Sequence, residues 1–336
     1  MKSKRILHIL LALMALIIPL KGAAGIMSGD ANDDGTIGMD DLTVLINYLL
    51  TEDTSSINFT NAATCDGLDS DIITMDDLTI LINYLLTNEG LPTAATGEEE
   101  FVVNGVPFVM VTVEGGTFMM GATEEQGSDV SSREKPVHQV TVSTYCIGQT
   151  EVTQELWTAV MGSNPSNFTG QQQPVERVSW HDCHQFITQL NQLTGRDFRL
   201  PTEAEWEFAA RGGNESQGYK YSGSNNLALV AWYSYNDTWE RRGTGDGWHG
   251  THPVATRMPN ELNLFDMSGN VHEWTEDWYG NYTSDAQTNP TGPATGTTCV
   301  YRGGSWYFDE WFCRVSFRNS VEPTYRSHGI GLRLAL

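Results

Sequence analysis

A segment near the N-terminus occurs twice, and this repeat places the strongest constraint on how that part of the chain can fold. Residues 39–51 recur as residues 75–87 with one substitution, at an offset of 36. In each copy the apolar residues return at the spacing of one helix face, which predicts a short amphipathic helix. Such a helix cannot bury its apolar face alone, whereas two copies can bury theirs against each other. We therefore expect residues 25–90 to form a small all-α module.

A loop rich in oxygen ligands precedes each predicted helix. In the first loop the oxygen ligands are Asp30, Asn32, Asp34, Thr36 and Asp41, and the first four of them lie at alternating positions. Gly35 lies at the sharp turn, and hard oxygen ligands in this order are what calcium requires. The alternative for this loop is an Asx-rich turn that caps a helix. The second loop keeps Asp66 and Asp77 at the equivalent ends, and whether calcium fills it is left open.

A duplicated calcium loop, each copy followed by one helix, resembles the dockerin module over roughly residues 29–87. In that family the module docks onto a partner domain, so the resemblance implies a docking partner. The alternative is a spacer that becomes rigid when calcium binds. Residues 91–100 are polar, with glycine, proline and acids and no apolar period, and we expect them to be a linker.

Residues 1–24 have the pattern of a secretory signal peptide. Lys2, Lys4 and Arg5 precede an apolar run over residues 6–20, and small residues follow. The run is shorter than the ~20 residues that a membrane span needs, so we expect no transmembrane segment. The protein is then secreted, either periplasmic or extracellular. The net charge of −23 argues against nucleic acid as a partner, because acidic side chains repel phosphates.

Residues 101–336 predict a larger domain of the α+β class. Apolar runs predict two strands and helical spacing predicts two helices, in the order 109–113, 137–142, 155–161 and 181–193. A third helix is expected after Thr202, which forms a capping box with Glu205. The remaining residues are typical of loops and short strands.

A set of short motifs follows in order along this domain. They are GGTFMMG at 115–121, EVT at 151–153, PV at 174–175, VSW at 178–180, RLPTEAEW at 199–206, DMSGNVHEW at 266–274, RGGSW at 302–306 and GLR at 331–333. The set resembles the formylglycine-generating enzyme, or sulfatase-modifying factor, family over residues 105–336. The resemblance implies a heavily decorated C-type-lectin-like fold.

The resemblance also implies two calcium sites in this domain. One would use the carboxylates of Asp266 and Glu273 with the carbonyls of Gly269 and Val271. The alternative is that Glu273 only accepts hydrogen bonds from backbone amides. A second site would use Asp246, the Trp248 carbonyl and Asn236. Calcium is therefore the cofactor that we expect.

Catalytic members of the family are implied to use copper and two cysteines, three and eight residues after the serine of the Gly-Gly-Ser motif. That serine is Ser305, and Cys313 occupies the second cysteine position, whereas Phe308 occupies the first. A phenyl ring cannot bind copper, and soft Cu(I) favours paired sulfur ligands, so copper is not expected here. Cys313 alone would need a neighbouring base such as His328 to act as a nucleophile. A packed or disulfide-bonded cysteine, with Cys299 as the candidate partner, is favoured.

The C-terminal tail has the composition of a binding surface. The candidate ligand-binding residues are Tyr307, Phe308, Asp309, Phe312, Phe317, Asn319, Tyr325 and His328. Aromatic side chains give contact area at low entropic cost, and polar ones give adaptable hydrogen bonds. The alternative is that part of the tail is core, which we expect for Val315 and Leu332 and consider for Phe317. The tail also resembles the variable ends of lectin-fold proteins diversified by retroelements.

Together these patterns predict a secreted, calcium-stabilised binding protein. Its lectin-like domain would recognise a protein or glycan ligand, and its dockerin-like module would attach it to a partner. One alternative is a formylglycine-generating oxidase that acts on sulfatase cysteines through Cys313. Another is a structural component positioned by the dockerin-like module.

Overall fold

The computed structural model describes residues 97–128, 130–234 and 250–336. By its internal contacts the chain divides into two units, residues 1–91 and 92–336, and every described residue belongs to the second. The signal peptide, the dockerin-like module and its calcium loops lie outside the described residues and stay predictions. Of the helices that the structure describes, none has the length and apolar character needed to cross a membrane.

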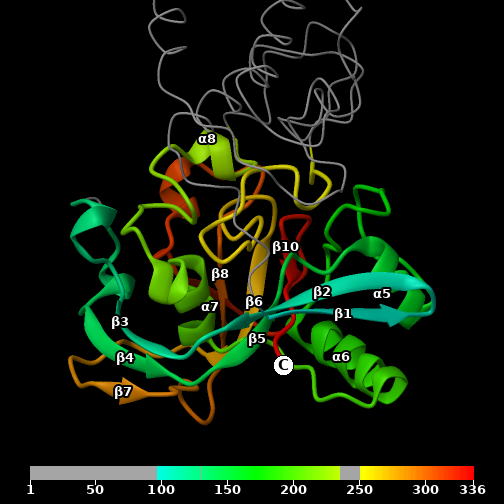
Figure 1. Ribbon diagram of the computed structural model, residues 1–336, viewed down its shortest axis with the longest axis horizontal. Coiled ribbons are helices and arrows are strands. Elements are labelled where there is room, and N and C mark those ends of the chain that lie inside the picture. The colour runs from blue at the N-terminus through cyan, green and yellow to red at the C-terminus, as the bar shows by residue number, and fades with distance from the viewer. Residues whose placement is uncertain (1–96, 129, 235–249) are drawn as a thin grey trace, which may run out of the picture. The chain divides into compact units, whose positions relative to one another are not determined.

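An antiparallel sheet begins the domain, in the order β1 (Glu98–Val103), β2 (Val106–Val113) and β5 (Tyr145–Gly148) (Figure 1). Asn104 and Gly105 join β1 to β2 with φ angles of 50° and 86°, the left-handed values that an Asn-Gly hairpin turn uses. β1 starts inside the expected 91–100 linker. Its first three residues pair through their backbone with β2 and leave their glutamate side chains exposed. A linker-like composition is therefore compatible with an edge strand.

Two further sheets are built from short strands. One has the order β10 (Ile330–Leu332), β6 (His272–Trp278), β8 (Cys299–Arg302) and β9 (Asn319–Val321), with β10 parallel to β6. The other has the order β3 (Gly116–Met120), β4 (His138–Val142) and β7 (Gln287–Thr288). The first of these sheets brings the C-terminal tail against the 266–274 motif.

The helices are held by local capping signals. They are α5 (Gln154–Met161), α6 (Trp180–Thr194), α7 (Glu203–Ala210) and the single turn α8 (Leu227–Val230), with 3-10 turns η1 (Glu124–Gln126), η2 (Ser132–Glu134), η3 (Gly213–Glu215) and η5 (Glu310–Cys313). The predicted capping box of Thr202 and Glu205 is confirmed at α7. The strands and helices expected from periodicity are also confirmed, in β2, β4, α5 and α6.

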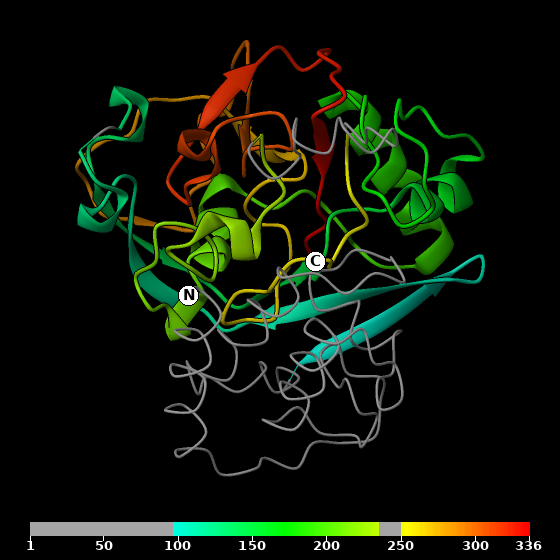
Figure 2. The same ribbon diagram turned by 90° about the horizontal axis from the view of Figure 1, so that it is seen from above.

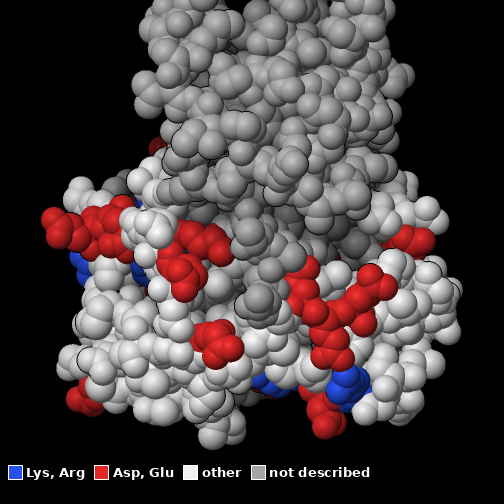
Figure 3. Space-filling model, in the orientation of Figure 1, with Lys and Arg blue, Asp and Glu red and all other residues white. Residues whose placement is uncertain are grey.

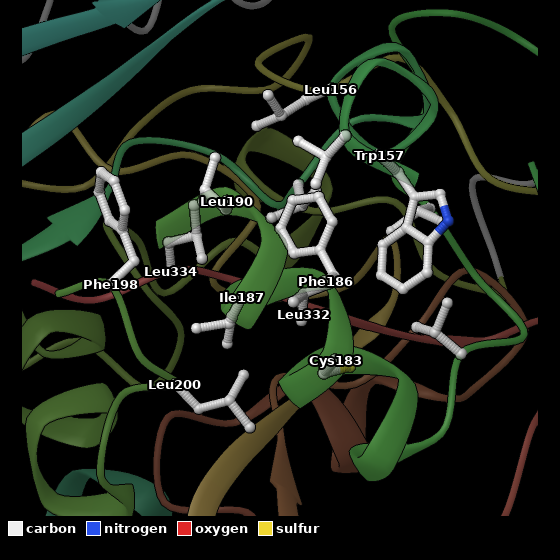
Figure 4. Packing of buried hydrophobic residues seen from close by; sticks show 14 of the residues in the cluster. Leu156, Trp157, Cys183, Phe186, Ile187, Leu190, Phe198, Leu200, Leu332 and Leu334 are labelled. Atoms are coloured by element: carbon white, nitrogen blue, oxygen red, sulfur yellow. The ribbon is translucent and has the colours of Figure 1, made fainter. Parts of the chain in front are cut away.

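Two large apolar clusters and a smaller one around α8 lie in the described part of the domain. In the first, Phe186 and Leu190 of α6 pack near Leu332 and Leu334, which follow the chain through β10 (Figure 4). Trp157 of α5 stacks on Phe186 with ring centroids 4.8 Å apart. The second cluster surrounds α7, which contacts β3 and β4. Along the long axis of the domain, β10 lies between the α5–α6 pair and α7 (Figure 2). The α+β class is confirmed.

Candidate functional site

The predicted catalytic position lies in the loop that follows β8. Gly303 and Gly304 have φ angles of 94° and 81°, left-handed values that glycine adopts without strain. A Cβ at position 304 would lie 2.5 Å from the Cys313 Sγ atom. The second glycine of the Gly-Gly-Ser motif therefore lets the backbone pass directly over the sulfur, which brings Ser305 and Cys313 together.

Cys313 is packed and unreactive in this arrangement. Its side chain is fully buried, and burial raises the pKa of the thiol well above its usual value. A thiol that stays protonated is a poor nucleophile and a poor metal ligand. The candidate base His328 packs instead against the rings of Trp306 and Tyr307. The cysteines in the described part of the chain are all free, so the suggested disulfide with Cys299 is wrong and the packed role is confirmed.

Phe308 is held inside a group of aromatic rings. Its ring centroid lies 4.4 Å from that of Tyr307, 4.6 Å from that of Phe312 and 5.0 Å from that of His272. The first of the two cysteine positions in the catalytic pattern thus contains a ring with aromatic neighbours. The described residues offer no cluster of His, Cys, Asp and Glu that could hold a metal there.

His272 is a site residue that we did not anticipate from the sequence. It is buried, and its Nδ1 atom donates a hydrogen bond to the Arg302 carbonyl oxygen at 3.3 Å. Burial lowers the pKa of its imidazole to about 3, so the ring is neutral at physiological pH. It packs on Tyr301 as well as on Phe308, which makes it the inner wall of the aromatic group. The only signal in the sequence was its place within the 266–274 motif.

We name as the aromatic surface the tail residues that retain exposed area around Phe308. These are Tyr307, Phe308, Asp309, Trp311, Phe312, Tyr325 and His328. Tyr325 is 43% exposed and is one of the large apolar side chains that the domain leaves in solvent. Trp311 was absent from the candidates and joins them because its ring packs edge-on against Phe312.

Phe317 does not belong to this surface, which corrects its selection as a ligand-binding residue. Its side chain is 2% exposed, and its ring packs edge-on against the rings of Phe312 and Trp311. Val315 and Leu332 are buried as expected. Asn319 is half-buried, and its side-chain oxygen accepts a hydrogen bond from Arg133.

At the predicted calcium turn, residues 266–273, the guanidinium of Arg333 already supplies a positive charge. Both Glu273 oxygens accept hydrogen bonds from Arg333, at 2.8–3.1 Å, and one also accepts from Trp206 Nε1 at 2.7 Å. Asp266 uses one oxygen to accept from the Ala255 amide at 2.8 Å. Calcium does not fit at Glu273, because a guanidinium already neutralises that buried carboxylate. Asn236, Asp246 and Trp248, the residues of the second predicted calcium site, lie outside the described residues.

A family model described as the sulfatase-modifying factor enzyme 1-like domain matches residues 103–336. The chain belongs to this family. The ordered motifs from residue 115 to residue 333 are therefore correctly attributed to a sulfatase-modifying factor domain, whose mixed, sheet-rich architecture is the one described above.

Curated and solved relatives within this family include both enzymes and other proteins. "Chaperone protein LppX" of Paenibacillus barcinonensis is 35% identical over 257 residues, which are 64% of this chain and 82% of that protein. The formylglycine-generating enzyme of Streptomyces coelicolor is 37% identical over 181 residues, which are 51% of this chain and 55% of the enzyme. Among solved structures, Treponema denticola variable protein 1 is 33% identical with a TM-score of 0.62, covering 71% of this chain and 98% of that one. The chain thus spans little more than half of the Streptomyces enzyme.

Proposed function

We propose that this sulfatase-modifying factor domain is a non-catalytic recognition module. The observation that carries the proposal is the ring of Phe308, which occupies the first of the two cysteine positions implied by the family pattern. Soft Cu(I) is held by paired sulfur ligands, and a phenyl ring supplies none. The remaining thiol, that of Cys313, is buried and has a raised pKa. Copper-dependent oxidation of a substrate cysteine is therefore not supported by these residues.

The aromatic surface supplies the chemistry of recognition in place of catalysis. Its rings pack against one another in edge-on and tilted pairs, so they are rigid before any ligand arrives. Rigid aromatic side chains lose little conformational entropy on binding, and the exposed Asp309 and His328 add polar contacts. The ligand is a protein or a glycan. A solved relative that is matched over 98% of its own length bears the name variable protein, and a tail that varies in sequence would suit recognition of different ligands.

The rest of the chain fits a secreted and attached protein. Residues 1–24 have the charge and apolar pattern of a signal peptide. The dockerin-like module over residues 25–90 would bind calcium through Asp30, Asp34 and Asp41 and dock onto a partner domain. Calcium then orders the module rather than the 266–273 turn, where Arg333 is the counter-charge.

A selection experiment tests the proposed recognition. The mature chain is used to select binders from a displayed peptide library and to probe a glycan array. We expect enriched binders to lose about tenfold or more in affinity for a Tyr325→Ala/His328→Ala double variant, because hot-spot aromatic residues dominate binding. Leu193→Ala, which removes an apolar side chain of α6 that is 53% exposed against 43% for Tyr325, is the control. Binders that recognise all three proteins equally would refute the proposed surface.

A second measurement addresses the oxidase alternative directly. The chain is loaded with Cu(I) and incubated with a cysteine-containing sulfatase peptide, and the products are analysed by mass spectrometry. We expect no aldehyde product. Catalytic turnover by the chain as it stands would overturn the recognition proposal.

A further inference from the structure

A hollow lies away from the aromatic surface, between the start of α7, β4 and the segment after β6. It has a volume of about 260 Å³, and its lining residues include His138, Glu203, Asp277, Trp278, Tyr282 and Arg318. None of the residues of the aromatic surface lines it. Figure 1 shows α7, β4 and β7 on the same side of the domain, and α7 contacts β4. A volume of this size holds several water molecules or one small organic group.

Asp277 is the unusual residue of this hollow. It is 4% exposed, and its Oδ2 atom accepts a hydrogen bond from the Glu203 amide at the start of α7, at 2.8 Å. Within the described residues, its Oδ1 atom has no hydrogen-bond donor and the carboxylate has no ion-pair partner. Burial, with the nearby charge of Glu203, raises the pKa of Asp277 to about 8. Gly292 keeps this oxygen uncovered, because a Cβ there would lie 3.1 Å from Oδ1.

The neighbouring carboxylate of Glu203, unlike that of Asp277, accepts hydrogen bonds from several side chains. Glu203 accepts from Arg302 at 3.0 Å, from Arg318 at 2.6 Å and from the Tyr282 hydroxyl at 3.2 Å. Arg318 lies over the Tyr282 ring, with its Cζ atom 3.9 Å from the ring centroid. The Arg318 guanidinium is therefore hydrogen-bonded to Glu203, and although its charge lowers the pKa of Asp277, burial and the charge of Glu203 raise that pKa more.

His138 adds a second acceptor to the lining. It is 2% exposed, and its Nδ1 atom lies 3.1 Å from the Pro136 carbonyl oxygen. A carbonyl oxygen only accepts hydrogen bonds, so Nδ1 bears a proton, and in the tautomer with a single ring proton Nε2 is an acceptor. In the described part of the chain no donor reaches Nε2. Asp277 and His138 thus both line the hollow, and no hydrogen bond to Asp277 Oδ1 or His138 Nε2 is found among the described residues.

We propose that this hollow binds a small organic cation, a primary ammonium group on a short alkyl chain. An ammonium carries three donors and one positive charge, which match the unmet acceptors of Asp277 and His138 and the unpaired charge of Asp277. The ring of Trp278 lines the same space and favours a cation near its face, whereas the Tyr282 ring is already covered by Arg318. The end of a lysine side chain and a free alkylamine share this chemistry. The inference does not depend on the proposed function of the aromatic surface.

Saturation-transfer NMR on the mature full-length chain tests the inference. The probe is n-butylammonium chloride at pH 9, where both the carboxylate and the amine are charged, and 1-butanol is the uncharged probe of matched length. We expect saturable binding of the ammonium and about tenfold or weaker binding of the alcohol, because hydrogen bonds to charged groups are the stronger ones. Equal binding of both probes, or no saturable binding of the ammonium, would overturn the inference.

Variants then locate the site. Asp277→Asn removes the charge and should weaken ammonium binding by about ten- to hundredfold. Gln287→Lys places a resident ammonium at the lining of the hollow without removing a contact of α7, and it should also weaken binding. Tyr325→Ala, on the aromatic surface, should leave ammonium binding unchanged. Thermal unfolding of each variant confirms that it is folded, and unchanged affinity in folded forms of both hollow variants would refute the placement.

Discussion

Residues 313–318 lie between an apolar region and an ionic region of the domain interior. On one side, alternate residues Cys313, Val315 and Phe317 enter apolar clusters. On the other side, Arg314, Ser316 and Arg318 reach buried glutamates, and Arg314 and Ser316 share Glu134. Six consecutive residues therefore connect the back of the aromatic surface to a buried ionic network. The interior of this tail is therefore scaffold on both sides, and the recognition that we propose uses the residues that flank it.

The surface and the interior of the domain also differ in the charges that they contain. On the face of the domain shown in Figure 3, acidic side chains far outnumber basic ones. Arg302, Arg314 and Arg333 are instead fully buried, each paired with a glutamate. Among the described residues, Arg302, Arg314, Arg318 and Arg333 are buried, so these four positive charges do not offset the acidic side chains at the surface.

The largest expected effect comes from breaking the ionic side. Arg314→Met leaves the buried Glu134 carboxylate without its bidentate partner, now at 2.6 and 2.9 Å. We expect a loss of about 3–5 kcal/mol in the free energy of unfolding, because an unpaired buried charge is costly. Chemical denaturation measures it. The control is Arg326→Met, which breaks the half-exposed pair with Asp182 and should cost about 1 kcal/mol or less. Equal losses would show that burial does not separate these arginines.

The apolar side should respond somewhat less. Phe317→Ala empties a position that is 2% exposed among the rings of Trp311 and Phe312. We expect a loss of about 3 kcal/mol from lost burial and the cavity left behind. Phe312→Ala, at a half-buried position of the same cluster, should cost clearly less. If Phe312→Ala were the more damaging change, Phe312 rather than Phe317 would be the structural residue.

Acid should weaken the ionic side selectively. Burial raises the pKa of Glu134, but hydrogen bonds from Arg314 and Ser316 lower it more, so its pKa in the folded protein lies below the usual 4.5. A carboxyl group with a lowered folded pKa stabilises the protein above its unfolded pKa, and that contribution is lost as the pH falls through the folded value. Unfolding free energies measured from pH 7 down to pH 3 should therefore fall below about pH 4.5. A Glu134→Gln variant should show a shallower fall, and an unchanged slope would contradict the assignment.

Local signals in the sequence were enough for most of the scaffold. Strands β2 and β4 and helices α5, α6 and α7 follow from hydrophobic period and capping residues, which depend only on neighbours along the chain. The family motifs identified the domain as a whole. The start of β1 was hidden because Glu98–Glu100 pair with β2 through their backbone and leave their charged side chains exposed, without the alternation of a half-buried strand.

The candidate site was less predictable because its residues are defined by distant partners. Phe317 looks like any other tail aromatic until its neighbours from η5 cover it. Glu273 was assigned to calcium because the sequence cannot show that Arg333, sixty residues later, reaches it first. His272 is marked only by its place in the 266–274 motif and Asp277 carries no local signal, since their burial rather than their residue type makes them unusual.

The smallest expected change in stability is the one that most directly separates recognition from scaffold. Tyr325 is 43% exposed, so Tyr325→Ala removes little buried area and should change the free energy of unfolding by about 0.5 kcal/mol or less. Trp306 of the same tail is 8% exposed and donates a hydrogen bond from its indole nitrogen to the His328 carbonyl at 3.1 Å, so Trp306→Ala should cost several times more. Thermal and chemical unfolding of the two variants make the comparison. A large loss from Tyr325→Ala would make Tyr325 part of the scaffold, and the aromatic surface would then lack its most exposed ring.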